Sequence, residues 1–136
     1  MDGNPFEFLK GVGTEGVLLV GSFQCNASSD PASTTFRAPP ALKGFTVSYA
    51  ATGTYTVTLP AGFTLPAQPL FVAAWPQFAT LATDWFECGV LGESTLNATT
   101  RQFVVQAHRN GTAREPANTA GNRINFAIYA RNTTGV

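Results

Sequence analysis

Two neighbouring segments alternate large apolar and small polar side chains, and this pattern constrains the fold more than any other feature. In residues 45–50 (Phe-Thr-Val-Ser-Tyr-Ala) and 55–59 (Tyr-Thr-Val-Thr-Leu), every second side chain is large and apolar. A period of two residues is typical of a β-strand with one buried and one exposed face. Between them, Gly53 can adopt the positive φ of a tight turn, so the two segments predict a β-hairpin with a hydroxyl-lined outer face.

Other runs rich in β-branched and aromatic residues, each bounded by Gly, Pro, Ser or Asp, predict the remaining strands. These runs are residues 17–24, 34–37, 70–75, 85–91, 103–108 and 124–130. No window carries the spacing of a long amphipathic helix, and only residues 78–84 predict a short helical turn. Sheets of short strands without helices must cover each other. About eight strands therefore predict an all-β fold, an antiparallel two-sheet sandwich of jelly-roll type.

The first fifteen residues have no strand partner in this scheme. A chain of 136 residues fits one domain. We therefore expect an N-terminal arm, residues 1–15, followed by a β-sandwich domain, residues 16–136. The arm carries Phe6, Phe8 and Leu9, and exposed apolar side chains of this kind predict a surface that receives them.

Charge is sparse and balanced. Eight Lys and Arg residues cancel eight Asp and Glu residues, and charged residues make up only 12% of the chain. Binding to nucleic acid requires a basic patch that follows the phosphates, and attraction to an anionic membrane requires basic clusters. We therefore expect neither partner.

The start of the chain lacks the basic stretch and apolar run of a secretory signal, and no apolar run approaches the ~20 residues of a membrane-spanning helix. We expect a soluble protein made in the cytoplasm. There, Cys25 and Cys88 are expected to be free thiols packed as small apolar residues, although their even number leaves a bridge between them open.

No catalytic pattern stands out. His108 is the only histidine, and no Gly-x-Ser-x-Gly turn accompanies it, so a Ser–His–acid triad has no visible partners. Cys25, Cys88 and His108 lack the short paired spacings of a zinc site. Asp84 and Glu87 are close enough in sequence to resemble a glycosidase pair, but charges at the end of a strand fit them better. We therefore expect a non-enzymatic protein without metal or cofactor.

Aromatic residues crowd around one connection, and residues 110–122 form a long polar loop between the last two strands. These aromatic side chains either close one end of the sandwich and pack against another subunit, or form a platform on which a sugar stacks. The candidate partner or glycan surface comprises Trp75, Phe78, Trp85, Arg109 and Arg114.

Residues 53–60 (Gly-Thr-Tyr-Thr-Val-Thr-Leu-Pro) and 123–133 (Arg-Ile-Asn-Phe-Ala-Ile-Tyr-Ala-Arg-Asn-Thr) resemble a group of short virion proteins of tailed bacteriophages. The resemblance covers the chain from Gly44 onward. It implies a compact β-sandwich that forms a homotrimer and decorates or cements the capsid by binding the major capsid protein. It implies no catalytic residues.

The leading hypothesis is therefore a trimeric head decoration or cement protein on the capsid surface of a virion, anchored by the arm through Phe6, Phe8 and Leu9. Hydroxyl-lined strand faces with few charges suit a symmetric, partly wet subunit interface. The alternative is a carbohydrate-binding module or the receptor-binding tip of a phage tail or fibre. A glycan hydrolase that uses Asp84 and Glu87 is a third hypothesis.

Overall fold

The fold is described by a computed structural model. It covers three stretches of the chain, residues 16–61, 69–91 and 101–131. The predicted arm, residues 1–15, lies outside the described residues, together with Phe6, Phe8 and Leu9. The anchoring role of these side chains stays a prediction.

Strands dominate the described stretches. They are β1 (Gly16–Gln24), β2 (Thr46–Ala51), β3 (Thr54–Thr58), β4 (Pro69–Gln77), β5 (Glu87–Val90), β6 (Gln102–Arg109), β7 (Thr112–Ala113) and β8 (Arg123–Arg131). The helical elements are two 3₁₀ helices, η1 (Ser33–Thr35) and η2 (Pro40–Leu42), and the short α-helix α2 (Leu81–Asp84). In these stretches no helix has the length and apolar character needed to cross a membrane.

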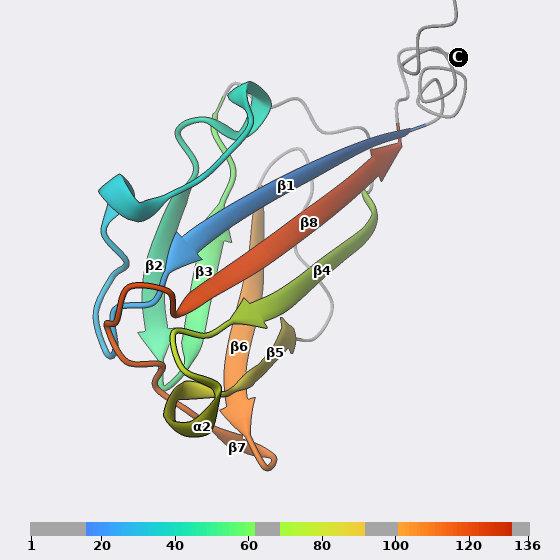
Figure 1. Ribbon diagram of the computed structural model, residues 1–136. Helices are drawn as coiled ribbons and strands as arrows, with labels where there is room; N and C mark the ends of the chain where they lie inside the picture. Colours follow the sequence, from blue (N-terminus) through green and yellow to red (C-terminus); the bar gives the residue numbers. More distant parts are fainter. Residues whose placement is uncertain (1–15, 62–68, 92–100, 132–136) are drawn as a thin grey trace, which may run out of the picture.

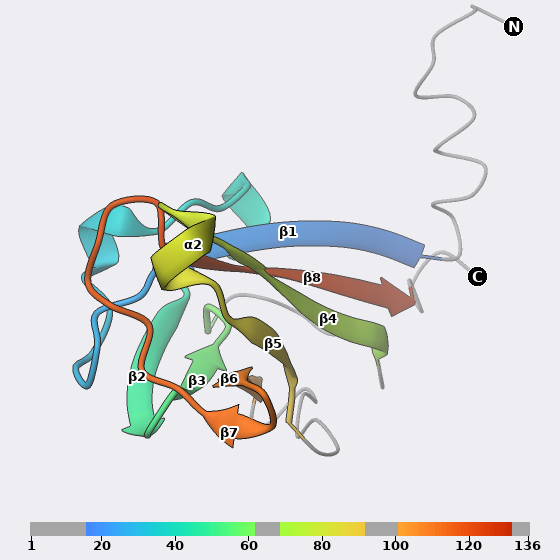
Figure 2. The same cartoon turned by 60° about the horizontal axis from the view of Figure 1, so that its bottom comes forward.

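The strands form two antiparallel sheets. One has three strands in the order β1-β8-β4, and the other has the order β2-β3-β6-β5 with β7 added to β6. Figure 1 shows the three-stranded sheet in front of the five-stranded one, and Figure 2 shows them as two layers with α2 at one end. The predicted all-β two-sheet sandwich is confirmed.

The chain crosses repeatedly between the two layers. It leaves the three-stranded sheet after β1, returns to it at β4, leaves again for β5, and comes back at β8. The first and last strands of the described chain pair with each other along their whole length. The jelly-roll type of this sandwich stays a prediction.

The predicted hairpin is confirmed as β2 and β3. Val47 pairs with Val57, and both side chains are buried, whereas Thr46 pairs with Thr58 on the outer face. Gly53 has a φ of +63°, the left-handed conformation that the turn requires and that glycine adopts without strain. The period of two residues therefore determined both the strand pair and the face that it buries.

Aromatic rings fill the space between the sheets. Phe126 of β8 meets Phe45 and Phe103 edge-on, each with ring centroids 5.3 Å apart. Phe23 of β1 meets Tyr55 of β3 in the same way at 5.5 Å. All five side chains are buried, so these edge-to-face contacts connect the two sheets.

Residues 34–37 do not form the predicted strand. The 3₁₀ helix η1 occupies the first half of this segment, and only Arg37 pairs, in an isolated bridge with Ser22. The hydroxyl of Thr35 donates a hydrogen bond to the carbonyl of Ala32 at 2.7 Å. Local bonds from Ser and Thr to the backbone compete with strand pairing, and here the local bond prevails.

Three other segments can be compared with the predictions made from local sequence pattern. The predicted helical turn in residues 78–84 is confirmed as α2. The predicted strand over residues 85–91 shortens to β5, because the carbonyl of Trp85 accepts hydrogen bonds from the Arg109 side chain and lies outside the ladder. The polar loop, residues 110–122, contains β7, which was not predicted.

Gly21 of β1 is expected to be sensitive to any side chain. A Cβ at this position would lie 2.3 Å from Cζ of the buried Phe126 ring. Gly21→Ala should therefore lower the free energy of unfolding by about 1–3 kcal/mol, as overpacked cores do, and urea denaturation will measure this. At Gly89 of β5 a Cβ would meet nothing within 4 Å, so Gly89→Ala is the matched control. Equal losses in the two variants would contradict the packing described here.

Candidate functional site

The outer face of the three-stranded sheet exposes large apolar side chains. Leu18 and Val20 of β1 are 57% and 44% exposed, and Phe71 and Trp75 of β4 are 50% and 42% exposed. Together with Tyr129 of the central strand β8, they form what we call the apolar sheet face. Contiguous apolar surface of this kind marks interaction sites on folded proteins.

Strand register places these side chains in rows. Leu18 and Phe71 both lie opposite Tyr129, one on each side of it. The rings of Phe71 and Tyr129 stack, with centroids 5.4 Å apart and planes 18° apart. In the next row, Ala73 and Ala127 pair and add only small side chains. The apolar sheet face therefore continues across all three strands.

Charge is almost absent from this sheet. The described side chains of its strands are those of residues 18–24, 71–77 and 123–129. Arg123 is the only charged one among them, and it is buried. Its Nε donates to the hydroxyl of Ser22 at 2.7 Å and its Nη2 donates to the carbonyl of Thr35 at 2.6 Å. Within these ranges the sheet thus presents no exposed charge.

The sequence-based predictions did not include Leu18, Val20, Phe71 or Tyr129 as site residues. A signal was present in residues 17–20, Val-Leu-Leu-Val, which do not alternate. A strand that is apolar at successive positions has two apolar faces, and only one of them can lie between the sheets. The second face therefore needs another partner.

The outer face of the five-stranded sheet is different. The side-chain amide of Gln102 donates to the hydroxyl of Thr58 at 3.2 Å, and that of Gln106 donates to the hydroxyl of Thr54 at 3.1 Å. The predicted hydroxyl-lined face is thus present, with some of its polar groups bonded to one another within the sheet. The stronger candidate for subunit contact is the apolar sheet face.

The three aromatic residues of the candidate glycan surface lie in different surroundings. Trp75 belongs to the apolar sheet face. Phe78 is half-buried and packs edge-on against the buried Phe86, with centroids 5.3 Å apart. Trp85 lies beneath Arg109, whose guanidinium carbon is 4.5 Å from the centre of the indole ring. The structure therefore brings Trp85 together with the arginines and places Trp75 on another surface.

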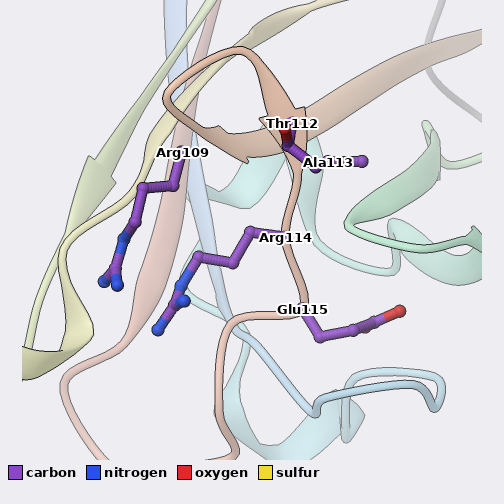
Figure 3. A pocket seen from close by; sticks show the side chains of 5 residues that line it. All are labelled: Arg109, Thr112, Ala113, Arg114 and Glu115. Atoms are coloured by element: carbon purple, nitrogen blue, oxygen red, sulfur yellow. The ribbon is translucent and has the colours of Figure 1, made fainter.

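Arg109 and Arg114 converge on the carboxyl end of α2, and we call them the arginine pair (Figure 3). Both Nη2 atoms donate to the carbonyl of Thr83, at 3.1 Å from Arg109 and 3.3 Å from Arg114. Nε of Arg109 also donates to the carbonyl of Trp85 at 2.9 Å. Desolvation and the neighbouring charge of Arg114 hold the pKa of Arg109 below its usual value.

The β2–β3 turn contacts the backbone that carries Arg114. The backbone N–H of Ala107 donates to the carbonyl of Gly53 at 2.7 Å, and that of Arg114 donates to the carbonyl of Ala107 at 3.0 Å. A Cβ on Gly53 would lie 2.3 Å from the carbonyl oxygen of Arg114. Glycine at this turn therefore permits the close approach that positions Arg114.

The acid and histidine candidates lie on β5, β6 and α2. His108 and Glu87 lie opposite each other across β6 and β5, with Nδ1 and Oε2 4.0 Å apart. Asp84 ends α2. No three His, Cys, Asp or Glu side chains come together there as ligands for a metal ion.

Both cysteines are free thiols, as expected. Cys25 is buried in the core, and Cys88 of β5 is partly buried against it. Burial raises the pKa of each thiol to about 12. A thiol that stays protonated is a poor nucleophile, so the two side chains serve packing.

Comparison with known proteins adds no family. No protein-family model, curated protein or solved structure matches the chain. Inference about function therefore depends on the surfaces described above.

The thiols are expected to resist modification in the folded protein. At pH 8, Cys25 and Cys88 should react with a disulfide reagent at least about 100-fold more slowly than in denaturant, because a pKa of about 12 leaves little thiolate. Their burial also stabilises the fold fully below pH 9.0, and this contribution is lost as the pH rises toward 12, since unfolded thiols ionise first. Cys88→Ser isolates Cys25. Rapid native labelling of Cys25 in that variant would contradict its burial.

Proposed function

We propose that this is a non-enzymatic structural protein whose copies associate through the apolar sheet face, as a trimer that decorates or cements a bacteriophage capsid. The observation that carries the proposal is the apolar sheet face itself. Leu18, Val20, Phe71, Trp75 and Tyr129 lie on one side of a sheet whose other side already faces the core.

The absence of exposed charge among the described side chains of this sheet favours a second copy of this chain as the occupant. When a protein packs against itself around a symmetry axis, any exposed charge on the interface meets or approaches its own copy. Like charges at close range cost free energy. Since the described side chains of this sheet expose no charge, three copies around one axis can bring these faces into contact without like charges meeting. The exposed Arg37, which is bridged to Ser22, lies at the edge of the sheet and not among these side chains.

The assignment to a virion is supported by the resemblance of residues 53–60 and 123–133 to short phage virion proteins. A decoration protein must also bind its shell through repeated contacts that are weak singly. A trimer presents three copies of each contact, and linked contacts strengthen one another. The arm, residues 1–15, joins the sandwich at Gly16, the first residue of β1, so it starts from the same sheet as the apolar sheet face.

Phe71→Glu tests the interface directly. A carboxylate in the centre of an apolar contact loses its water without gaining a partner. The dissociation constant of the oligomer should rise at least about 100-fold, as for interface hot spots. Light scattering coupled to size exclusion should show a trimer for the native chain and a monomer for the variant. Ser48→Glu, on the exposed side of β2, is the control and should remain trimeric. A native chain that stays monomeric would refute this interface.

The virion role is tested by deleting residues 1–10. If the arm anchors the protein through Phe6, Phe8 and Leu9, the shortened chain should keep its β-type circular dichroism and its oligomeric state. It should sediment with undecorated phage heads far less than the full chain, which should also raise the heat resistance of the heads. Full binding by the shortened chain would remove the anchoring role. Failure of the full chain to bind any head would remove the decoration role and leave the interface test unaffected.

A further inference from the structure

We propose that the arginine pair is a binding site for the carboxylate of an acidic sugar in a polysaccharide. The site lies where β6 turns into β7, on the five-stranded sheet, so it does not depend on the apolar sheet face. It is a hollow of about 450 Å³. The hollow is lined by Arg109, Thr112, Ala113, Arg114 and Glu115.

Figure 3 shows how the side chains of the hollow are arranged. The two guanidinium groups lie side by side and point the same way, whereas Glu115 extends in the opposite direction. An oxygen of Glu115 already accepts a hydrogen bond from the Tyr49 hydroxyl. The acidic residue at the rim is therefore turned away from the arginine pair.

Within the described stretches, neither guanidinium forms an ion pair. Among the described residues, no carboxylate oxygen lies within 4.0 Å of Arg109 or Arg114. Asp84 attracts Arg109 from a greater distance. Nε of Arg114 is buried and has no hydrogen-bond acceptor. Two adjacent cations with unused donors form a site that attracts an oxyanion, and arginine binds carboxylates through two parallel hydrogen bonds.

The site is also largely preorganised. Arg109 is held by the carbonyls of Thr83 and Trp85 and by the indole ring beneath it. Arg114 shares the Thr83 carbonyl. Because these contacts already order the two long side chains, a ligand loses less of its binding free energy in immobilising them.

Size favours a sugar over a single amino-acid carboxylate. The hollow, of about 450 Å³, is wide and open to solvent, so it can take one residue of a polysaccharide whose neighbours extend beyond it, whereas an Asp or Glu side chain fills only a small part of such a space. Thr112 adds a hydroxyl that can exchange hydrogen bonds with a sugar hydroxyl. In this arrangement the two arginines bind the carboxylate, and the Thr112 hydroxyl bonds to a hydroxyl of the sugar ring.

The test uses the full chain and trigalacturonate as the probe. Calorimetry should give a Kd of about 1 mM at low salt, and the fluorescence of Trp85 should change because Arg109 lies over it. The methyl ester of the same trisaccharide, in which the carboxylates are blocked, should bind at least about 10-fold more weakly. Sodium sulfate and a triglutamate peptide, tested alongside, should also bind more weakly.

Two variants locate the binding. Thr112→Glu keeps both arginines in place and puts a carboxylate into the hollow, so it should weaken trigalacturonate binding at least about 10-fold. The double variant Arg109→Gln/Arg114→Gln should do the same. The control Arg37→Gln/Lys43→Gln removes two exposed positive charges elsewhere and should stay within about twofold of the native chain.

Several outcomes would overturn the proposal. They are equal binding of the methyl ester, equal binding of sulfate or triglutamate, an equal loss in the Arg37→Gln/Lys43→Gln control, unchanged binding in Thr112→Glu, and no binding of trigalacturonate at all. None of these results bears on the oligomeric state. The acidic-sugar site and the apolar sheet face are therefore tested independently of each other.

Discussion

The packing of aromatic rings between the two sheets is the interaction on which the rest of the structure depends. Phe126 lies at its centre, because its strand β8 is the middle strand of one sheet and its ring reaches Phe45 and Phe103 of the other layer. With Phe126 facing inward, its neighbours Asn125 and Ala127 must face outward. One buried ring thus sets which side chains of the central strand point to the outer side of the sheet, and through the register it does so for β1 and β4 as well.

The sandwich consequently has two unlike outer surfaces. On the five-stranded sheet, Thr and Gln side chains bond to one another and suit contact with water. On the three-stranded sheet, Leu18, Phe71 and Tyr129 form a row of large, mainly apolar side chains. The arginine pair lies at one end of the five-stranded sheet. Self-association and ligand binding, as proposed, therefore use different sheets and do not compete for surface.

Much of the fold could be predicted from residue patterns, because alternation and turn chemistry are local. Residues 34–37 were the exception, since the hydrogen bond of the Thr35 hydroxyl to the backbone outweighs β-propensity there. The β6–β7 hairpin also carried a local signal, Asn110-Gly111, and both residues adopt positive φ. The row of Leu18, Phe71 and Tyr129 could not be predicted, because it depends on which strands are neighbours, and pattern alone does not determine strand order.

The unpaired cysteines have a consequence for where the protein can mature. No cross-link holds the described chain together, so no folding step waits for an oxidant, and a reducing compartment does not weaken the fold. Burial shields Cys25 from later oxidation as well. The same sandwich can therefore form under reducing conditions and persist under oxidising ones.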